Sequence, residues 1–140
     1  MKNIIKFFVV SYLLLINDAN SQQMVQNIND VYKLKENKTL FIDRPLKDLL
    51  KEIRPEIKTA HVFNEDYFVF IFKFTTIEQQ RQDQGSFLER VALFVYVKDS
   101  IPWGWKEKPK GTELNWTSDD VQKFGNFIVT NVSVVYPKQD

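Results

Sequence analysis

Alternating apolar side chains are the clearest pattern in the chain, and they predict two long β-strands. Phenylalanine occupies four alternate positions within residues 67–76, which is the spacing of one face of a strand. Residues 87–98 form a second such run, rich in valine. Both runs are apolar on two faces at their centres, so we expect them in the middle of a sheet or covered on both sides. Shorter apolar runs at 39–42, 57–63 and 129–136 predict three further strands.

Two segments instead carry apolar side chains at helical spacing. In residues 46–53 the apolar positions lie on one helical face, and Pro45 before them suits a first helical turn. A second helix is expected in 117–128, where Thr117 and Asp120 resemble a capping box. The buried face of this second helix is expected to consist of Val121, Phe124, Phe127 and Ile128.

These elements predict an α+β fold with the order β-α-β-β-β-α-β. We expect a mostly antiparallel sheet of four or five strands with two helices on one face, and a ferredoxin-like layout with one extra strand fits this order. Residues 39–137 would form this single domain. Residues 22–38 are expected to be a polar lead-in, and the glutamine-rich residues 77–86 a solvated connection between two strands.

The first 21 residues have the three parts of a secretory signal peptide. Lys2 and Lys6 precede an apolar stretch at 7–16, and small residues at 19–21 resemble a cleavage site. The apolar stretch is shorter than the ~20 residues of a membrane-spanning helix. We therefore expect residues 1–21 to be removed and the product to be exported, periplasmic or secreted, with no transmembrane span in the mature chain.

Composition excludes several classes of protein. The 140 residues contain 19 Lys+Arg and 18 Asp+Glu, so no bulk positive charge favours nucleic acid as a partner. The absence of cysteine excludes disulfides, thiolate catalysis and cysteine-ligated zinc. With 12 Phe, 5 Tyr and 3 Trp, the hydrophobic core can stabilise the domain alone. We expect no cofactor and no metal.

The histidine and the paired acidic residues of the chain show no catalytic motif in the sequence. His61, the single histidine, lies between apolar residues of a predicted strand, which indicates a structural role. Glu65 and Asp66 occupy a predicted turn, while Asp119 and Asp120 fit the first turn of a helix. No nucleophile elbow, phosphate-binding loop or zinc-binding motif occurs. A small carbohydrate-active hydrolase therefore remains only an alternative interpretation.

The segment 101–116 is the candidate contact surface, because it holds all three tryptophans of the chain beside several lysines. Indole rings stack on sugars and fill protein interfaces, and lysine adds attraction for an anionic partner. A protein or glycan partner would suit it. Alternatively, the indoles fold back and close the open end of the sheet. The candidate residues are Trp103, Trp105, Trp116, Lys106, Lys108 and Lys110.

The leader, the Ala-x-Ser-Gln junction and the phenylalanine-rich, cysteine-free composition resemble small uncharacterised exported proteins of Gram-negative bacteria. This resemblance implies a periplasmic or secreted location. Residues 39–63 also resemble the β-α-β opening of the short N-terminal domain of secretins and TonB-dependent receptors, which implies no site residue. The sequence thus predicts a non-enzymatic exported binding or interaction domain, or alternatively an accessory subunit of an envelope assembly.

Overall fold

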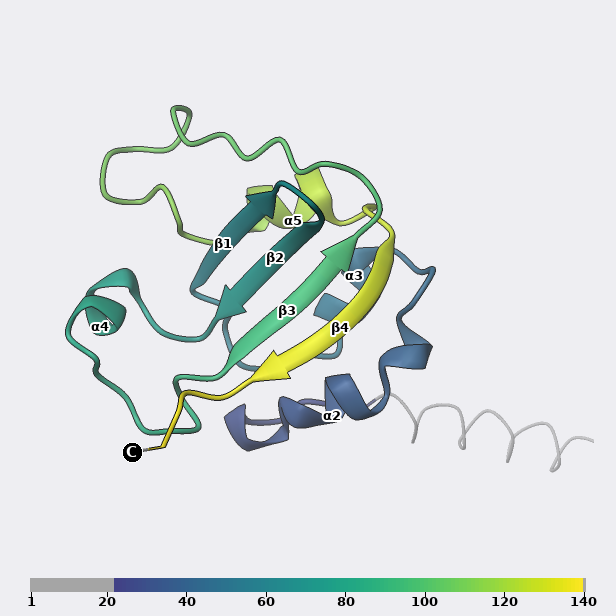
Figure 1. Cartoon of the computed structure of the whole chain (residues 1–140), viewed down its shortest axis with the longest axis horizontal. Coiled ribbons are helices and arrows are strands. Elements are labelled where there is room, and N and C mark those ends of the chain that lie inside the picture. Colours follow the sequence, from purple (N-terminus) through teal and green to yellow (C-terminus); the bar gives the residue numbers. More distant parts are fainter. Residues whose placement is uncertain (1–21, 140) are drawn as a thin grey trace, which may run out of the picture.

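The computed structural model describes residues 22–139, and the predicted signal peptide lies outside them. The described chain forms one antiparallel sheet of four strands, whose order in space is their order in sequence (Figure 1). The strands are β1 Thr59–Asn64, β2 Phe68–Lys73, β3 Ala92–Val97 and β4 Val129–Val135. With its helices, this sheet confirms the α+β class, and β2 and β3 are its central strands as their two apolar faces predict.

Within residues 22–139, four short α-helices and two short 3₁₀ helices accompany the sheet. In Figure 1, α3 and α5 lie behind the sheet, α2 lies beside β4, and α4 lies outside the sheet near the end of β2. The helices are α2 Tyr32–Glu36, α3 Leu46–Leu50, α4 Ile77–Arg81 and α5 Ser118–Phe124, and the 3₁₀ turns are Ile28–Asp30 and Lys38–Leu40. None of the helices within residues 22–139 is long and apolar enough to cross a membrane.

The predicted element order is wrong at its first strand and in its number of helices. Within residues 22–139 the order is α-α-β-β-α-β-α-β, so two helices are added to the two expected. Every strand pairs with its neighbour in sequence, which excludes the ferredoxin-like layout. Residues 39–42 are not a strand, because the Phe41 and Ile42 amides donate to the Lys38 carbonyl at 2.9 and 3.1 Å. These local hydrogen bonds produce a turn that still buries the Phe41 ring.

The glutamine-rich connection, which its polar composition predicted to be a solvated loop, contains a helix. α4 begins after Thr76, whose hydroxyl accepts from the Gln79 amide while the Gln79 side chain accepts from the Thr76 amide. This reciprocal cap satisfies two backbone donors that a helix N-terminus otherwise leaves free. The strand predicted from residue 87 begins only at Ala92, since the Arg90 amide donates to the Ser86 carbonyl in a preceding turn.

The segment 22–38 contributes to the core rather than only leading into it. Val25, Val31 and Leu34 are fully buried. The Val25 amide donates to the Glu52 carbonyl at 2.8 Å, and the Arg54 amide donates to the Val25 carbonyl at 2.9 Å. These bonds fasten the segment beside the end of α3.

The core lies between the sheet and α3 and α5. Phe70 and Phe72 on β2 are fully buried, and the Phe70 ring centroid lies 5.5 Å from that of Phe124 on α5. Through this contact the buried phenylalanine face of β2 packs against α5. That helix ends at Phe124, however, so Phe127 and Ile128 belong to the connection that leads into β4 and not to the helix.

Candidate functional site

The loop between β3 and α5 crosses one end of the sheet and is fastened there at two points (Figure 1). Near its start, the Asn64 side chain donates to the Ile101 carbonyl at 2.7 Å and accepts from the Ile101 amide at 2.8 Å. Near its end, the Ala60 amide donates to the Leu114 carbonyl at 2.9 Å. Both points lie along β1, so the loop covers part of this edge strand and limits its pairing with other chains.

Two of the three tryptophans of the loop close the core. Trp103 is 7% exposed, and its indole nitrogen donates to the Glu113 carbonyl at 2.9 Å. Its ring stacks on Trp116 at a centroid distance of 6.2 Å and on Phe124 at 5.8 Å. The Trp116 ring in turn meets the edge of Phe72 at 4.8 Å. Trp103 and Trp116 therefore cover the open end of the core. This is the alternative interpretation of the loop, in which the indoles fold back onto the sheet.

Trp105 has a different environment from the other two tryptophans. Its side chain is 49% exposed, and its ring touches Trp103 edge to face at 6.4 Å. Lys106 beside it and Lys110 further along the loop are also exposed. Of the six candidate residues, these three are available to a partner.

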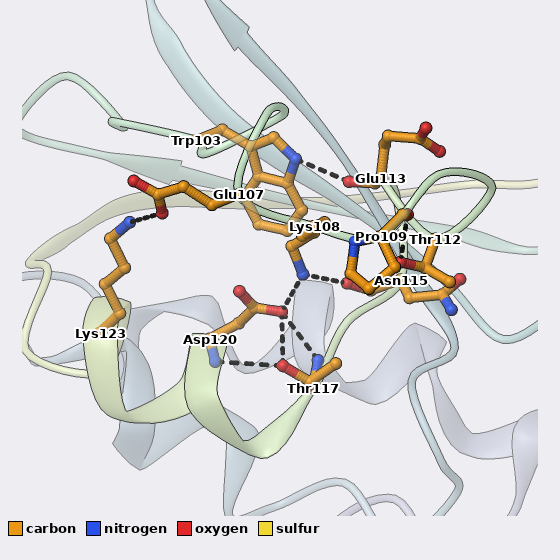
Figure 2. A network of polar contacts seen from close by, with 10 residues as sticks. All are labelled: Trp103, Glu107, Lys108, Pro109, Thr112, Glu113, Asn115, Thr117, Asp120 and Lys123. Carbon is orange, nitrogen blue, oxygen red and sulfur yellow. Dashed lines mark hydrogen bonds and ion pairs between the residues drawn. The ribbon is translucent and has the colours of Figure 1, made fainter.

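Lys108 is held within the protein by three groups (Figure 2). Its ammonium donates to the Asn115 carbonyl at 2.7 Å and to the Asp120 carboxylate at 2.8 Å. It also lies 4.7 Å from the centre of the Trp103 ring, a cation–π contact. The Lys108 and Asp120 side chains are only 16% and 8% exposed, so solvent screens their ion pair little. Lys108 therefore fastens the middle of the loop to α5.

The same Asp120 oxygen caps the helix. It accepts from the Thr117 amide at 2.8 Å and from the Thr117 hydroxyl at 2.9 Å, while the Asp120 amide donates to that hydroxyl (Figure 2). The predicted capping box is thus present, with Asp120 in the role that glutamate usually has. Asp120 joins the start of α5 to the loop, a second role that no local sequence pattern indicates.

A cavity of about 440 Å³ lies beside this network, between the loop and α5. Its charged wall groups are largely paired, since Lys108 holds Asp120 and the Lys123 ammonium lies 3.7 Å from the Glu107 carboxylate. Glycoside hydrolysis needs one carboxyl group that gives a proton and a second that acts as base or nucleophile. The Asp120 carboxylate in this wall already accepts three hydrogen bonds, one of them from the Lys108 ammonium. In the described part of the chain, no three histidine, aspartate or glutamate side chains gather as a metal site.

His61 lies on β1, and its ring nitrogen lies 3.2 Å from the Gln80 side-chain oxygen on α4. Burial lowers the pKa of His61, and the positive charge of Lys73 lowers it further, while the hydrogen bond to Gln80 partly opposes both. Its hydrogen-bond partner is an amide rather than a carboxylate or a nucleophile. This geometry agrees with the structural role that the sequence indicates.

Comparisons with known proteins gave no relative. No protein-family model matches the chain, and neither the curated proteins nor the solved structures searched contain a match to it.

Proposed function

We propose that this protein is an exported, non-enzymatic binding domain, periplasmic or secreted, whose contact surface is Trp105 with Lys106 and Lys110. The observation that carries the proposal is the half-exposed Trp105 indole on a loop whose neighbouring residues are fastened to the core. Export rests on the signal-like pattern of residues 1–21 and on the resemblance to small exported proteins of Gram-negative bacteria.

The fastened loop lowers the cost of binding. A flexible loop loses conformational entropy when a partner orders it, and that loss weakens the complex. Here the neighbours of Trp105 are ordered already by the Trp103 stack, the Lys108 ion pair and the Asn64 hydrogen bonds. Trp105 is thus presented from a rigid base, as is typical of residues that dominate the affinity of an interface.

The chemistry of this surface favours an acidic glycan. The face of an indole stacks on the apolar face of a sugar ring, and two exposed ammonium groups can pair with carboxylates on the same chain of sugars. An acidic protein surface is the second candidate partner, and it corresponds to an accessory subunit of an envelope assembly. The paired state of Lys108 and Asp120 supports binding over hydrolysis.

The test compares Trp105→Ala with Tyr67→Ala by measuring affinity for a panel of acidic and neutral polysaccharides. Tyr67 is the matched control, because it is 58% exposed and lies on the hairpin between β1 and β2. We expect Trp105→Ala to weaken binding of an acidic polysaccharide by about tenfold or more. Tyr67→Ala should bind as the wild type does, and both variants should keep the wild-type melting temperature.

Capture of an envelope protein in place of a glycan, lost in Trp105→Ala and retained in Tyr67→Ala, would assign the surface to a protein partner. Equal behaviour of the two variants toward every polysaccharide and in envelope extracts would refute the proposed surface.

A further inference from the structure

A second cavity, of about 180 Å³, lies between α4 and the sheet, and the described residues of its wall do not include any from the loop 101–116. It lies where β2 ends and where the chain turns into β3, a region that Figure 1 shows beside α4. A water molecule takes about 30 Å³ in the liquid, so the cavity has room for one small oxyanion. The polar and charged residues of its wall are Lys73, Thr75, Gln80, Asp83, Gln84 and Arg90.

The main evidence for a ligand is the unpaired side chain of Arg90 in the cavity wall. Its Nε atom is buried and has no hydrogen-bond partner, and it is the only side-chain nitrogen or oxygen in residues 22–139 in this condition. Buried charged donors are normally hydrogen-bonded, because leaving one unpaired costs free energy. The ion pairs of the described residues do not include Arg90. Nε itself is covered by protein atoms, so a ligand in the cavity would meet the outer guanidinium nitrogens of this partly buried side chain.

Lys73 supplies a second positive charge to the same cavity. It is the last residue of β2, its side chain is partly buried, and the ion pairs of the described chain do not include it either. Its charge is felt at the neighbouring His61, whose pKa it helps to lower. Asp83 is the single carboxylate of the wall, so the charged groups around the cavity sum to one net positive charge.

The remaining walls are shaped by groups that already have partners. The Gln80 side-chain amide donates to the Thr59 hydroxyl at 2.9 Å and to the Thr75 carbonyl at 3.1 Å. The Gln84 amide donates to the Gln82 side chain at 2.6 Å. The Gln80 hydrogen bonds hold α4 against the sheet, whereas the Gln84 bond is local to the chain after α4. Within residues 22–139, the Arg90 and Lys73 side chains form no ion pair.

We infer that this cavity binds a small oxyanion, with Arg90 donating a directed hydrogen bond and Lys73 neutralising the second negative oxygen. A guanidinium group matches the paired oxygens of a carboxylate or phosphate, and charge-assisted hydrogen bonds to such groups are the strong ones. A neutral ligand would leave the net positive charge of the cavity wall uncompensated. The inference is independent of the proposed contact surface at Trp105, which lies on a different loop.

The experiment titrates the full domain with inorganic phosphate and, separately, with acetate, at ionic strength held constant with sodium chloride. NMR follows the Arg90 Nε–H signal and the ring proton of His61, the single histidine of the chain. We expect saturable shifts of both signals and a rise in melting temperature, because a ligand that binds only the folded state stabilises it. A stronger response to phosphate would identify a tetrahedral anion, and a stronger response to acetate a carboxylate.

Arg90→Gln should weaken anion binding by about tenfold or more, and Lys73→Gln by about threefold or more, since each removes a charge-assisted contact. Arg81→Gln is the matched control, because Arg81 is exposed on α4 and does not line the cavity. If Arg90→Gln fails to fold, Arg90→Lys and Lys73→Gln take its place, with folding checked by their NMR spectra. Shifts that do not saturate, shifts that chloride reproduces, or an equal loss in Arg81→Gln would overturn the inference.

Discussion

Truncating Phe70 to alanine tests the arrangement of the core most directly. Phe70 lies on β2 and is fully buried. Four other aromatic rings surround its own, with centroid distances of 5.5 Å to Phe72, 5.5 Å to Phe124, 5.8 Å to Trp116 and 6.5 Å to Phe127. The Phe70 ring therefore joins the sheet to α5, to the end of the loop 101–116 and to the chain that enters β4.

The expected loss of stability follows from this position. Replacing a buried phenylalanine by alanine costs about 3–5 kcal/mol, because apolar surface is lost and a cavity remains. The edge-to-face contacts with Trp116 and Phe124 place the expected loss in the upper part of that range, since aromatic pairs add about 0.5–1.5 kcal/mol each. A domain of this size has about 5–15 kcal/mol of stability in total. Phe70→Ala should thus remove a large part of the unfolding free energy.

Equilibrium unfolding in urea, followed by tryptophan fluorescence, measures the effect, and the dependence on urea should keep its wild-type slope. Phe63→Ala is the matched control, because Phe63 lies on the neighbouring strand β1 but is 53% exposed. That variant should lose less than about 1 kcal/mol. A loss below about 1 kcal/mol in Phe70→Ala, or equal losses in the two variants, would show that the assigned core is incorrect.

Three further predictions concern the loop anchor, pH and export. Lys108→Met should reduce the unfolding free energy by about 1–3 kcal/mol in urea unfolding, because it leaves the Asp120 carboxylate short of its charged donor; Lys106→Met, at an exposed position, should change it by less than about 0.5 kcal/mol. The lowered pKa of His61 means that the unfolded chain binds its proton more readily. The contribution of His61 to the unfolding free energy should therefore be fully present above pH 6.5. It should be lost as the pH falls from there toward the folded-state pKa, and His61→Gln should flatten the dependence of unfolding free energy on pH in this range. Mass spectrometry of protein from the native host should find a chain that begins at Gln22, and a product that retains the leader would contradict export.

Local signals were sufficient to predict several elements from the sequence. Pro45 marks the start of α3, and Thr117 with Asp120 forms the cap that begins α5. These signals work because a cap or a fixed backbone angle acts within one turn of helix. The two strands with apolar side chains on both faces, β2 and β3, are the central strands, where side chains from two neighbouring strands help to shield each face from solvent.

The missed helix α4 and the incorrect strand at 39–42 have different physical causes. The Thr76 and Gln79 pair that caps α4 matches the capping-box pattern and can be read from the sequence, but the polar composition of the segment favoured a loop. The apolar run at 39–42 gave no such local signal. Its strand prediction depended on a partner strand, and the chain instead closed hydrogen bonds between near neighbours while Phe41 reached the core from a turn.

The sequence by itself determined the α+β class, the central strands, the starts of α3 and α5, and the segment that carries the tryptophans and lysines. Only the tertiary structure decided what each of those side chains does. Trp103 is buried and Trp105 is half exposed, although they lie two positions apart, and Lys108 is paired with Asp120 while Lys106 is exposed. Periodicity and caps act over a few residues, so sequence can reveal them. The burial of one loop side chain depends on which distant segments pack around it, and those contacts exist only in the folded chain.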